Sequence, residues 1–272
     1  MFFCLLPAAY CLVPSAYCLR SALKRMPSTI LEVTGLCKYF GGLAAVAGVD
    51  FCLEKDEILG LIGPNGSGKT TVFNLIAGVF KPDRGSIKLD GQDITGASSA
   101  AVCQMGIGRT FQIPLPFSRL TVLENVRLGR VYGSQPAESI KQAEMEADEI
   151  LEFIGLKAKR SILSGSLPLL DRKRLELGKA LATRPKVLLL DEILGGLTPA
   201  EIDTAMKLIL AIRNSGVTLV VVEHVMRAIM GISDRVIVLN SGAKIAEGPP
   251  KKVVHDRNVI EAYLGVDHHA NG

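Results

Sequence analysis

The chain has 272 residues, of which 48% are hydrophobic and 21% are charged, and its formal net charge is +4. These values are ordinary for a globular α/β protein of one large or two small domains. Arg20, Lys24 and Arg25 supply three of the positive charges in a segment without acids, so residues 26–272 carry only +1. The basic field of a nucleic-acid-binding protein is therefore missing, and we expect no nucleic-acid partner.

The first 25 residues do not match the pattern of the rest of the chain. Residues 1–19 are uncharged and mostly apolar, which is compatible with a signal peptide or a membrane anchor. However, no positive charge precedes the apolar run, and Pro7 and Pro14 interrupt it. Residues 7–13 and 14–20 form a tandem repeat with neither helical nor strand periodicity. We favour a non-native or mis-assigned extension over residues 1–25, with a native start at Met26 and a true anchor as the alternative.

Short apolar strands separated by glycine turns open the remaining chain. A turn at Gly41-Gly42 separates the first two strands, and a glycine-rich loop follows the third. The predicted strands are Ile30–Val33, Val46–Leu53, Ile58–Ile62 and Ser86–Leu89.

The pattern becomes mainly helical from Ser98 to about Ala182, and one segment, Ala137–Ile154, is clearly amphipathic. Its predicted apolar face consists of Ile140, Ala143, Ala147, Ile150, Leu151 and Ile154. Strands then resume at Val187–Leu190, Val217–Val222 and Val236–Leu239, with helical segments at Pro199–Ile212 and Val225–Met230. Uniformly apolar strands that alternate with helices predict an α/β fold with a mostly parallel sheet covered on both faces.

The glycine-rich loop after the third strand fits the phosphate-loop pattern G-x-x-x-x-G-K-[ST]. Its glycines let backbone N–H groups point at phosphate oxygens, and the following helix adds the positive end of its dipole. Lys69 would reach the β- and γ-phosphates, and the Thr70 hydroxyl would bind Mg²⁺. The predicted nucleotide-binding loop is Gly63, Pro64, Asn65, Gly66, Ser67, Gly68, Lys69, Thr70 and Thr71.

Polar side chains stand where two later strands end. Asp191 follows four apolar residues, at a position from which a carboxylate can reach the Mg²⁺ that Thr70 also binds. Glu192 comes next and can orient or deprotonate the attacking water. His224 ends the following strand, where its imidazole can hydrogen-bond the γ-phosphate. We expect Lys69, Glu192 and His224 to be the catalytic residues.

Two further residues are candidates for contacts with the nucleotide. Gln112 carries a neutral amide that can ligate Mg²⁺ or position water, so the predicted metal ligands are Thr70, Gln112 and Asp191. Phe40 or its neighbour Tyr39 could stack on adenine, with a role in the core as the alternative for either aromatic. The predicted cofactors are ATP and Mg²⁺.

Taken together, these motifs resemble the ATP-binding subunit of ABC transporters over Ile30–Gly265. Gly63–Thr71 is similar to Walker A, Gln112 to the Q-loop, Val187–Glu192 to Walker B with its catalytic glutamate, and His224 to the switch histidine. Phe40 matches the family's adenine-stacking aromatic. The resemblance implies a phosphate-loop NTPase core with a small antiparallel β subdomain and a helical insertion at about 98–182. The ATP-binding domain would span 26–265, followed by a disordered tail at 266–272.

Finer matches are typical of the branched-chain amino acid importer ATPases. They are the segments 40–43, 106–112 and 120–126, together with 245–248 and 259–265 near the C-terminus. The resemblance implies a peripheral ATPase on the cytoplasmic face of the inner (cell) membrane, which imports branched-chain amino acids or related amino acids and amides. It would work with two transmembrane permease subunits and an extracytoplasmic substrate-binding protein.

The signature of the family is altered in this chain. The helix Arg172–Ala182 sets its register, so that Leu167, Pro168, Leu169, Leu170 and Asp171 stand where the family has Leu-Ser-Gly-Gly-Gln. Residues 163–166 look more like the signature by composition but lie four positions too early. Pro168 offers neither a hydroxyl nor an N–H, and Leu170 adds bulk where backbone should approach a phosphate. Thr198 and Ile193 also replace the family's usual aspartate and proline.

In the family, each ATP site combines the Walker motifs of one subunit with the signature of the other. The altered signature therefore predicts a heterodimer, in which a second ABC ATPase completes the site at Lys69, Asp191 and Glu192. A soluble ABC ATPase of translation or DNA repair is an alternative, but the chain lacks the second ATPase unit or basic insertion usual there. A non-catalytic nucleotide sensor is another alternative, against which Glu192 and His224 argue.

Overall fold

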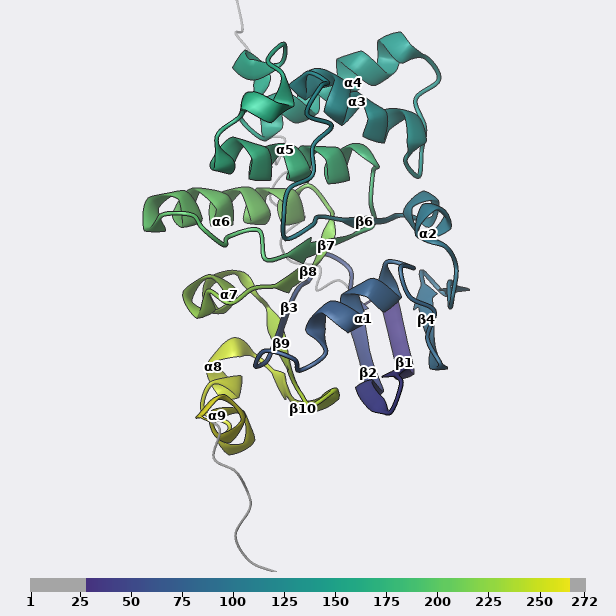
Figure 1. Cartoon of the computed structure of the whole chain (residues 1–272), viewed down its shortest axis with the longest axis vertical. Coiled ribbons are helices and arrows are strands. Elements are labelled where there is room, and N and C mark those ends of the chain that lie inside the picture. Colours follow the sequence, from purple (N-terminus) through teal and green to yellow (C-terminus); the bar gives the residue numbers. More distant parts are fainter. Residues whose placement is uncertain (1–27, 265–272) are drawn as a thin grey trace, which may run out of the picture.

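The protein is seen in a computed structural model that describes residues 28–264, and its helices and strands are labelled in Figure 1. The predicted extension over residues 1–25 and the predicted tail over residues 266–272 lie outside the described residues. Both therefore stay predictions.

A six-stranded sheet forms the centre of the molecule, in the order β10-β9-β3-β8-β7-β6. All neighbouring strands pair in parallel except β10, which pairs antiparallel with β9. The strands are β3 (Ile58–Ile62), β6 (Ile107–Arg109), β7 (Val187–Asp191), β8 (Thr218–Val222), β9 (Arg235–Asn240) and β10 (Ala243–Gly248). Parallel pairing brings the carboxyl ends of β3, β7 and β8 to one edge, and this is the edge where the polar residues follow.

The inner strands of the central sheet are almost uniformly apolar because both faces of the sheet are covered. In β7, Leu189 contributes to one apolar cluster and Leu188 to another on the opposite side of the sheet. Side chains alternate between faces along a strand, so a strand covered on both sides needs apolar residues at every position.

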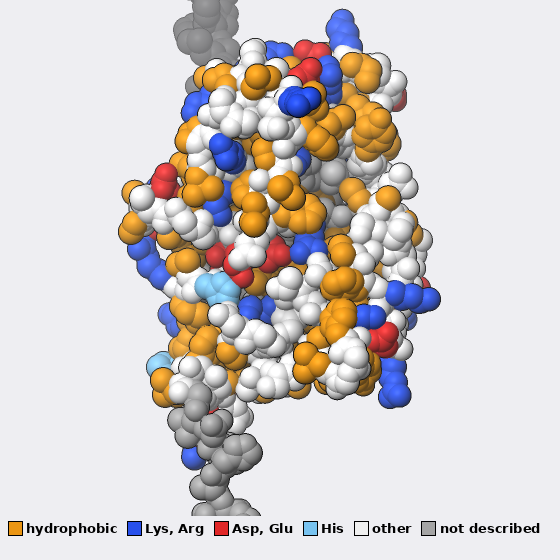
Figure 2. Space-filling view, in the orientation of Figure 1, with side chains coloured by type: hydrophobic (Ala, Val, Ile, Leu, Met, Phe, Trp, Pro, Cys, Tyr) orange, Lys and Arg blue, Asp and Glu red, His pale blue; other side chains and the backbone are white. Residues whose placement is uncertain are grey.

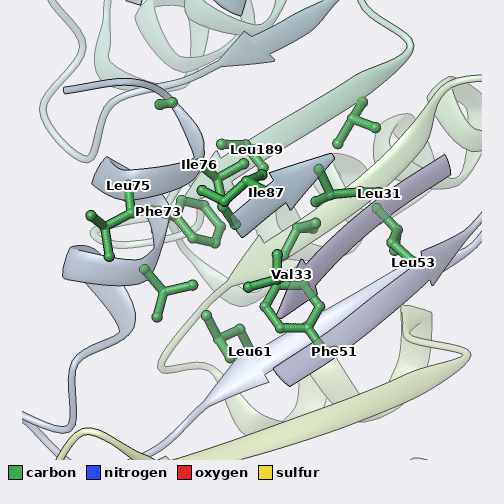
Figure 3. Packing of buried hydrophobic residues seen from close by; sticks show 14 of the residues in the cluster. Leu31, Val33, Phe51, Leu53, Leu61, Phe73, Leu75, Ile76, Ile87 and Leu189 are labelled. Carbon is green, nitrogen blue, oxygen red and sulfur yellow. The ribbon is translucent and has the colours of Figure 1, made fainter. Parts of the chain in front are cut away.

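One face packs against a four-stranded antiparallel sheet, in the order β2-β1-β4-β5. The strands are β1 (Thr29–Phe40), β2 (Leu43–Glu54), β4 (Arg84–Leu89) and β5 (Gln92–Asp93). As predicted, Gly41 and Gly42 form the turn between β1 and β2, with φ of 58° at Gly41. Figure 3 shows α1 (Lys69–Ile76) placing Phe73 and Ile76 against both sheets.

Helices cover the other face of the central sheet (Figure 1). They are α6 (Pro199–Asn214), α7 (Met226–Ile232), α8 (Pro250–Val253) and α9 (Arg257–Leu264). Val253 and Val259 bring the C-terminal helices into this cluster. None of the helices within residues 28–264 is long and apolar enough to cross a membrane.

A helical layer lies beyond the sheet and has an apolar cluster of its own. It contains α3 (Val122–Tyr132), α4 (Ile140–Phe153) and α5 (Leu169–Ala182), and α2 (Ser99–Met105) precedes it. The mainly helical prediction for 98–182 misses β6, which lies inside that range and belongs to the central sheet. Ser139 caps α4, so the helix begins at Ile140, and this side chain is 60% exposed instead of joining the apolar face as predicted.

Candidate functional site

The phosphate loop joins β3 to α1 and folds around its own lysine. Lys69 Nζ donates hydrogen bonds of 2.9 Å to the carbonyl oxygens of Gly63 and Pro64, and the lysine is only 6% exposed. Gly63 has φ of 151°, and a Cβ there would lie 2.1 Å from the carbonyl oxygen of Leu239. The backbone can take this path only with glycine at that position.

Burial is the main influence on Lys69 and lowers the pKa of its ammonium, while the carboxylates of Glu192 and Asp191 oppose this effect. The loop therefore places a partly desolvated cation between backbone oxygens and two acids. A phosphate group arriving at this ammonium would favour its charged form.

A cavity of about 480 Å³ opens in front of the phosphate loop. Phe40 lines it from the end of β1, opposite the loop residues, whereas Tyr39 is not among the lining residues. The Phe40 ring packs edge-on against Phe80 with centroids 5.4 Å apart, and Lys38 Nζ lies 5.7 Å from its centroid. The volume is within the range of small-molecule sites. The cavity also includes Gly66, Ser67, Gly68, Lys69, Thr70 and Thr71.

Glu192, His224 and Gln112 meet at the carboxyl end of the central sheet. His224 Nε2 lies 2.7 Å from Glu192 Oε1, and the Gln112 amide nitrogen donates to Glu192 Oε2. Glu192 has φ of 47°, a left-handed backbone conformation that is uncommon for residues other than glycine. Figure 2 shows acidic side chains and a histidine side by side in the middle of one face. The Gln112 amide is thus bonded to Glu192 and not to the predicted metal ligand Asp191.

Asp191 has a cationic partner that sequence reasoning missed. Arg109 Nη2 donates to Asp191 Oδ2 at 2.9 Å, and Arg109 Nη1 donates to Asn74 Oδ1 at 2.5 Å. The two side chains of the ion pair are 11% and 7% exposed. Arg109 was noted only as part of the segment around Gln112, because nothing in the sequence says that β6 lies beside β7.

Glu223 is a second residue that sequence reasoning missed. It directly precedes His224, is 3% exposed, and accepts the backbone N–H of Leu194 at 2.7 Å. Burial raises its pKa to about 7, against the opposing effects of the hydrogen bond from Leu194 and the nearby Lys173 ammonium. Lys173 is itself buried, and its Nζ donates to the backbone carbonyl of Glu192 at 3.4 Å.

The altered signature lies at the start of α5. Pro168 is the N-cap residue and offers no capping side chain, while Leu167 is buried in the helical layer. Asp171 is also buried and pairs with Lys159. Only residues 168–170 therefore face outward, beside the loop that contains Gly196.

The oxygen donors at the site fit Mg²⁺. Thr70 is exposed and lines the cavity, and the carboxylate of Asp191 stands at the end of β7 in the same central sheet. Within residues 28–264, no group of three or more acids, histidines and cysteines could hold a metal ion by itself. This fits an ion that is bound through one or two side chains and the phosphates of its nucleotide.

The fold and the site define a nucleotide-binding ATPase of the phosphate-loop class. Residues 46–195 match the family described as ABC transporter, and residues 243–269 match the family described as branched-chain amino acid ATP-binding cassette transporter. The chain therefore belongs to the ATP-binding cassettes of ABC transporters, which are ATPases. The predicted resemblance and the predicted α/β fold are both confirmed.

Relatives and solved structures agree with this assignment. The chain is 38% identical over 253 residues to the high-affinity branched-chain amino acid transport ATP-binding protein BraF of Pseudomonas aeruginosa. It is 39% identical to LivG of Escherichia coli K12, and each match covers 88% of this chain and 99% of the relative. An ATP-binding cassette solved in its ADP conformation is 33% identical with a TM-score of 0.80, covering 88% and 99% of the two chains. A dimeric cassette bound to ADP and phosphate is 25% identical with a TM-score of 0.73, covering 81% and 99%.

Proposed function

We propose that this chain powers the import of branched-chain amino acids, or related amino acids and amides, by hydrolysing ATP at the cytoplasmic face of the cell membrane. The observation that carries the ATPase role is the Glu192, His224 and Gln112 cluster beside the phosphate loop. The transport class is supported by the names of BraF and LivG and by the family match at residues 243–269.

The proposed reaction divides its work among these side chains. Lys69 and the loop N–H groups bind the phosphates, and Phe40 stacks on the adenine. Mg²⁺, when bound, neutralises charge on the β- and γ-phosphates, and Thr70 and Asp191 would hold it. Glu192 accepts a proton from the attacking water, while His224 orients Glu192 and contacts the γ-phosphate.

The Glu192→Gln variant tests the catalytic role in the assembled transporter. We expect ATP binding to be kept and turnover to fall by about 10²- to 10⁴-fold, because an amide cannot accept the proton. Glu149→Gln, which removes the same charge from an exposed position on α4, serves as the control. Unchanged turnover in Glu192→Gln would support the nucleotide-sensor alternative instead.

The proposed permease partners would dock on the loop that follows β6. Four of its apolar side chains are exposed, namely Phe111, Ile113, Leu115 and Phe117. The buried amide of Asn125 holds the far end of this loop, because it accepts the N–H of Phe117 at 2.8 Å and donates to the Phe117 carbonyl at 3.2 Å. Contiguous exposed apolar side chains of this kind are typical of protein interfaces.

A cavity of about 250 Å³ continues this surface between α2, α5 and β6, where Gly108, Arg109 and Phe111 contribute to its walls. Each of two permease subunits would dock on this surface of one ATPase subunit. An extracytoplasmic substrate-binding protein would deliver the substrate to the permeases. Purifying the complex from membranes and measuring which amino acids stimulate its ATPase activity tests both the partners and the transported class.

The second ATPase is proposed to be a different chain. The positions of the phosphate-binding signature are occupied by the pyrrolidine ring of Pro168 and the apolar side chains of Leu169 and Leu170. The site on this chain would then be completed by a partner with an intact signature. We expect the isolated chain to hydrolyse ATP slowly and the partner to restore the rate. The heterodimer would be contradicted if the isolated chain hydrolysed ATP at the full rate and substitutions in residues 167–171 abolished that activity.

A further inference from the structure

Arg109 connects three parts of the nucleotide site. From the end of β6, its guanidinium reaches Asp191 after β7, Asn74 on α1, and the face of Phe111 in the following loop. The Phe111 ring centroid lies 5.2 Å from the guanidinium carbon. Each of the two terminal nitrogens has its own acceptor, so the plane of the guanidinium is fixed by two bonds.

The contact sets the orientation of the Asp191 carboxylate. Its Oδ2 accepts from Arg109, and among residues 28–264 this is the one hydrogen bond found to the carboxylate group. The backbone N–H of Asp191 donates to Thr110 Oγ1 at 3.2 Å, which fixes the main chain at the same point. One carboxylate oxygen is therefore held by arginine, and the other is left for a further ligand.

We propose that Arg109 is a positioning residue that orients Asp191 to bind Mg²⁺. The inference rests on the proposed metal role of Asp191. Carboxylates that bind metals are commonly held by a hydrogen-bonding partner outside the coordination shell, and loss of that partner typically weakens metal binding about 10- to 100-fold.

The positive charge of Arg109 could instead compete with Mg²⁺ for Asp191. Orientation of the carboxylate strengthens Mg²⁺ binding, whereas competition weakens it. Mg²⁺ enters together with the triphosphate of ATP, so the bound group as a whole is negative and a nearby cation attracts it. Arg109 is also enclosed by Asn74, Asp191 and Phe111 and is not free to move aside. Orientation is therefore the dominant effect, and removing the guanidinium should weaken metal binding.

The test compares Arg109→Met, Arg109→Lys and the unaltered full-length chain. Binding of a fluorescent ATP analogue is measured first in EDTA and then during a Mg²⁺ titration. We expect affinity in EDTA to stay within about twofold, while the Mg²⁺ concentration at half-effect rises about 10- to 100-fold in Arg109→Met. Arg109→Lys keeps the charge but replaces the planar guanidinium, which bonds Asn74 and Asp191 through two separate nitrogens, by a single nitrogen, so we expect an intermediate rise.

Lys186→Met is the matched control, because Lys186 directly precedes β7 and pairs with the exposed Asp90 away from the site. This variant should leave the Mg²⁺ midpoint unchanged. An unchanged or lower midpoint in Arg109→Met would overturn the proposal, and a lower one would indicate competition. Equal losses of nucleotide affinity in EDTA and in Mg²⁺ would also overturn it, because Arg109 would then have a purely structural role. If Arg109→Met fails to fold, Arg109→Lys is judged by the same criteria. If the unaltered chain bound nucleotide with no dependence on Mg²⁺, the metal role itself would be wrong, while ATP binding would stand.

Discussion

Glu223 offers a sharp test of how burial controls the stability of this site. Its carboxyl group is buried and accepts the backbone N–H of Leu194. The Glu223→Gln variant keeps an oxygen for that hydrogen bond but cannot ionise. We expect the stability of the variant relative to the unaltered protein to rise between acidic and alkaline pH, by an amount that the shift in the pKa of Glu223 sets.

The magnitude follows from the difference between the folded and unfolded pKa values. The carboxyl ionises near 4.5 when unfolded and near 7 when folded. The stabilisation from keeping it protonated is fully present below pH 4.5 and is lost as the pH rises through 7. At about 1.4 kcal/mol for each pKa unit, the total loss is about 3 to 4 kcal/mol. The glutamine variant avoids this loss, so its advantage should grow by about 2 to 3 kcal/mol between pH 5 and pH 8.

Urea denaturation at several pH values measures this difference directly. Glu149→Gln makes the same chemical change on the exposed surface of α4 and should leave the pH profile unaltered. A Glu223→Gln variant whose stability relative to the unaltered protein is constant from pH 5 to pH 8 would refute the reasoning. That result would mean that the nearby Lys173 ammonium compensates the buried carboxylate fully.

Three further variants test packing, capping and the adenine contact. A Cβ at Gly178 would lie 2.5 Å from Ile154 Cδ1. Gly178→Ala should therefore lower the free energy of unfolding by about 1 to 3 kcal/mol in urea denaturation. Adding Ile154→Val should recover part of this stability. Thr198 caps α6 in a reciprocal capping box with Glu201, so Thr198→Ala should destabilise the fold by about 1 kcal/mol in the same assay, whereas Thr198→Ser should not. Phe40→Ala should weaken binding of a fluorescent ATP analogue about 3- to 10-fold, because a stacked ring contributes about 0.5 to 1.5 kcal/mol. Phe40→Tyr keeps a ring and should not weaken it. Equal affinities of the two variants would exclude stacking.

The phosphate loop and the large elements could be predicted because their signals are local. Glycine conformations, a lysine at a helix start and uniformly apolar strands all depend on neighbours in the sequence. The turn at Gly41-Gly42 and the strand that ends at Asp191 were predicted correctly for this reason. The start of α4 was predicted at Ala137, three residues too early, because the capping role of Ser139, whose side chain accepts the N–H of Gln142, was not recognised.

The contacts of Arg109 and Glu223 could not be predicted because they depend on which strands become neighbours. Arg109 reaches Asp191 because β6 pairs with β7, and Glu223 reaches Leu194 because β8 pairs with β7 on its other side. β6 has only three residues, which is too short to produce a recognisable periodicity. The sequence shows charges at the ends of strands, but the order of the strands decides which charges meet.

The hydrogen bonds of Asn125 have a consequence for the cost of assembling a transporter. Its amide also donates to the carbonyl oxygen of Thr121 at 2.9 Å and to Ser164 Oγ at 3.2 Å, which ties the loop end to two parts of the helical layer. The apolar side chains before Phe117 are thus presented from a segment that is already ordered at that end. A partner that binds an ordered segment loses less conformational entropy than one that must first fix it. Asn125 would thereby contribute to the affinity of an interface that it does not itself touch.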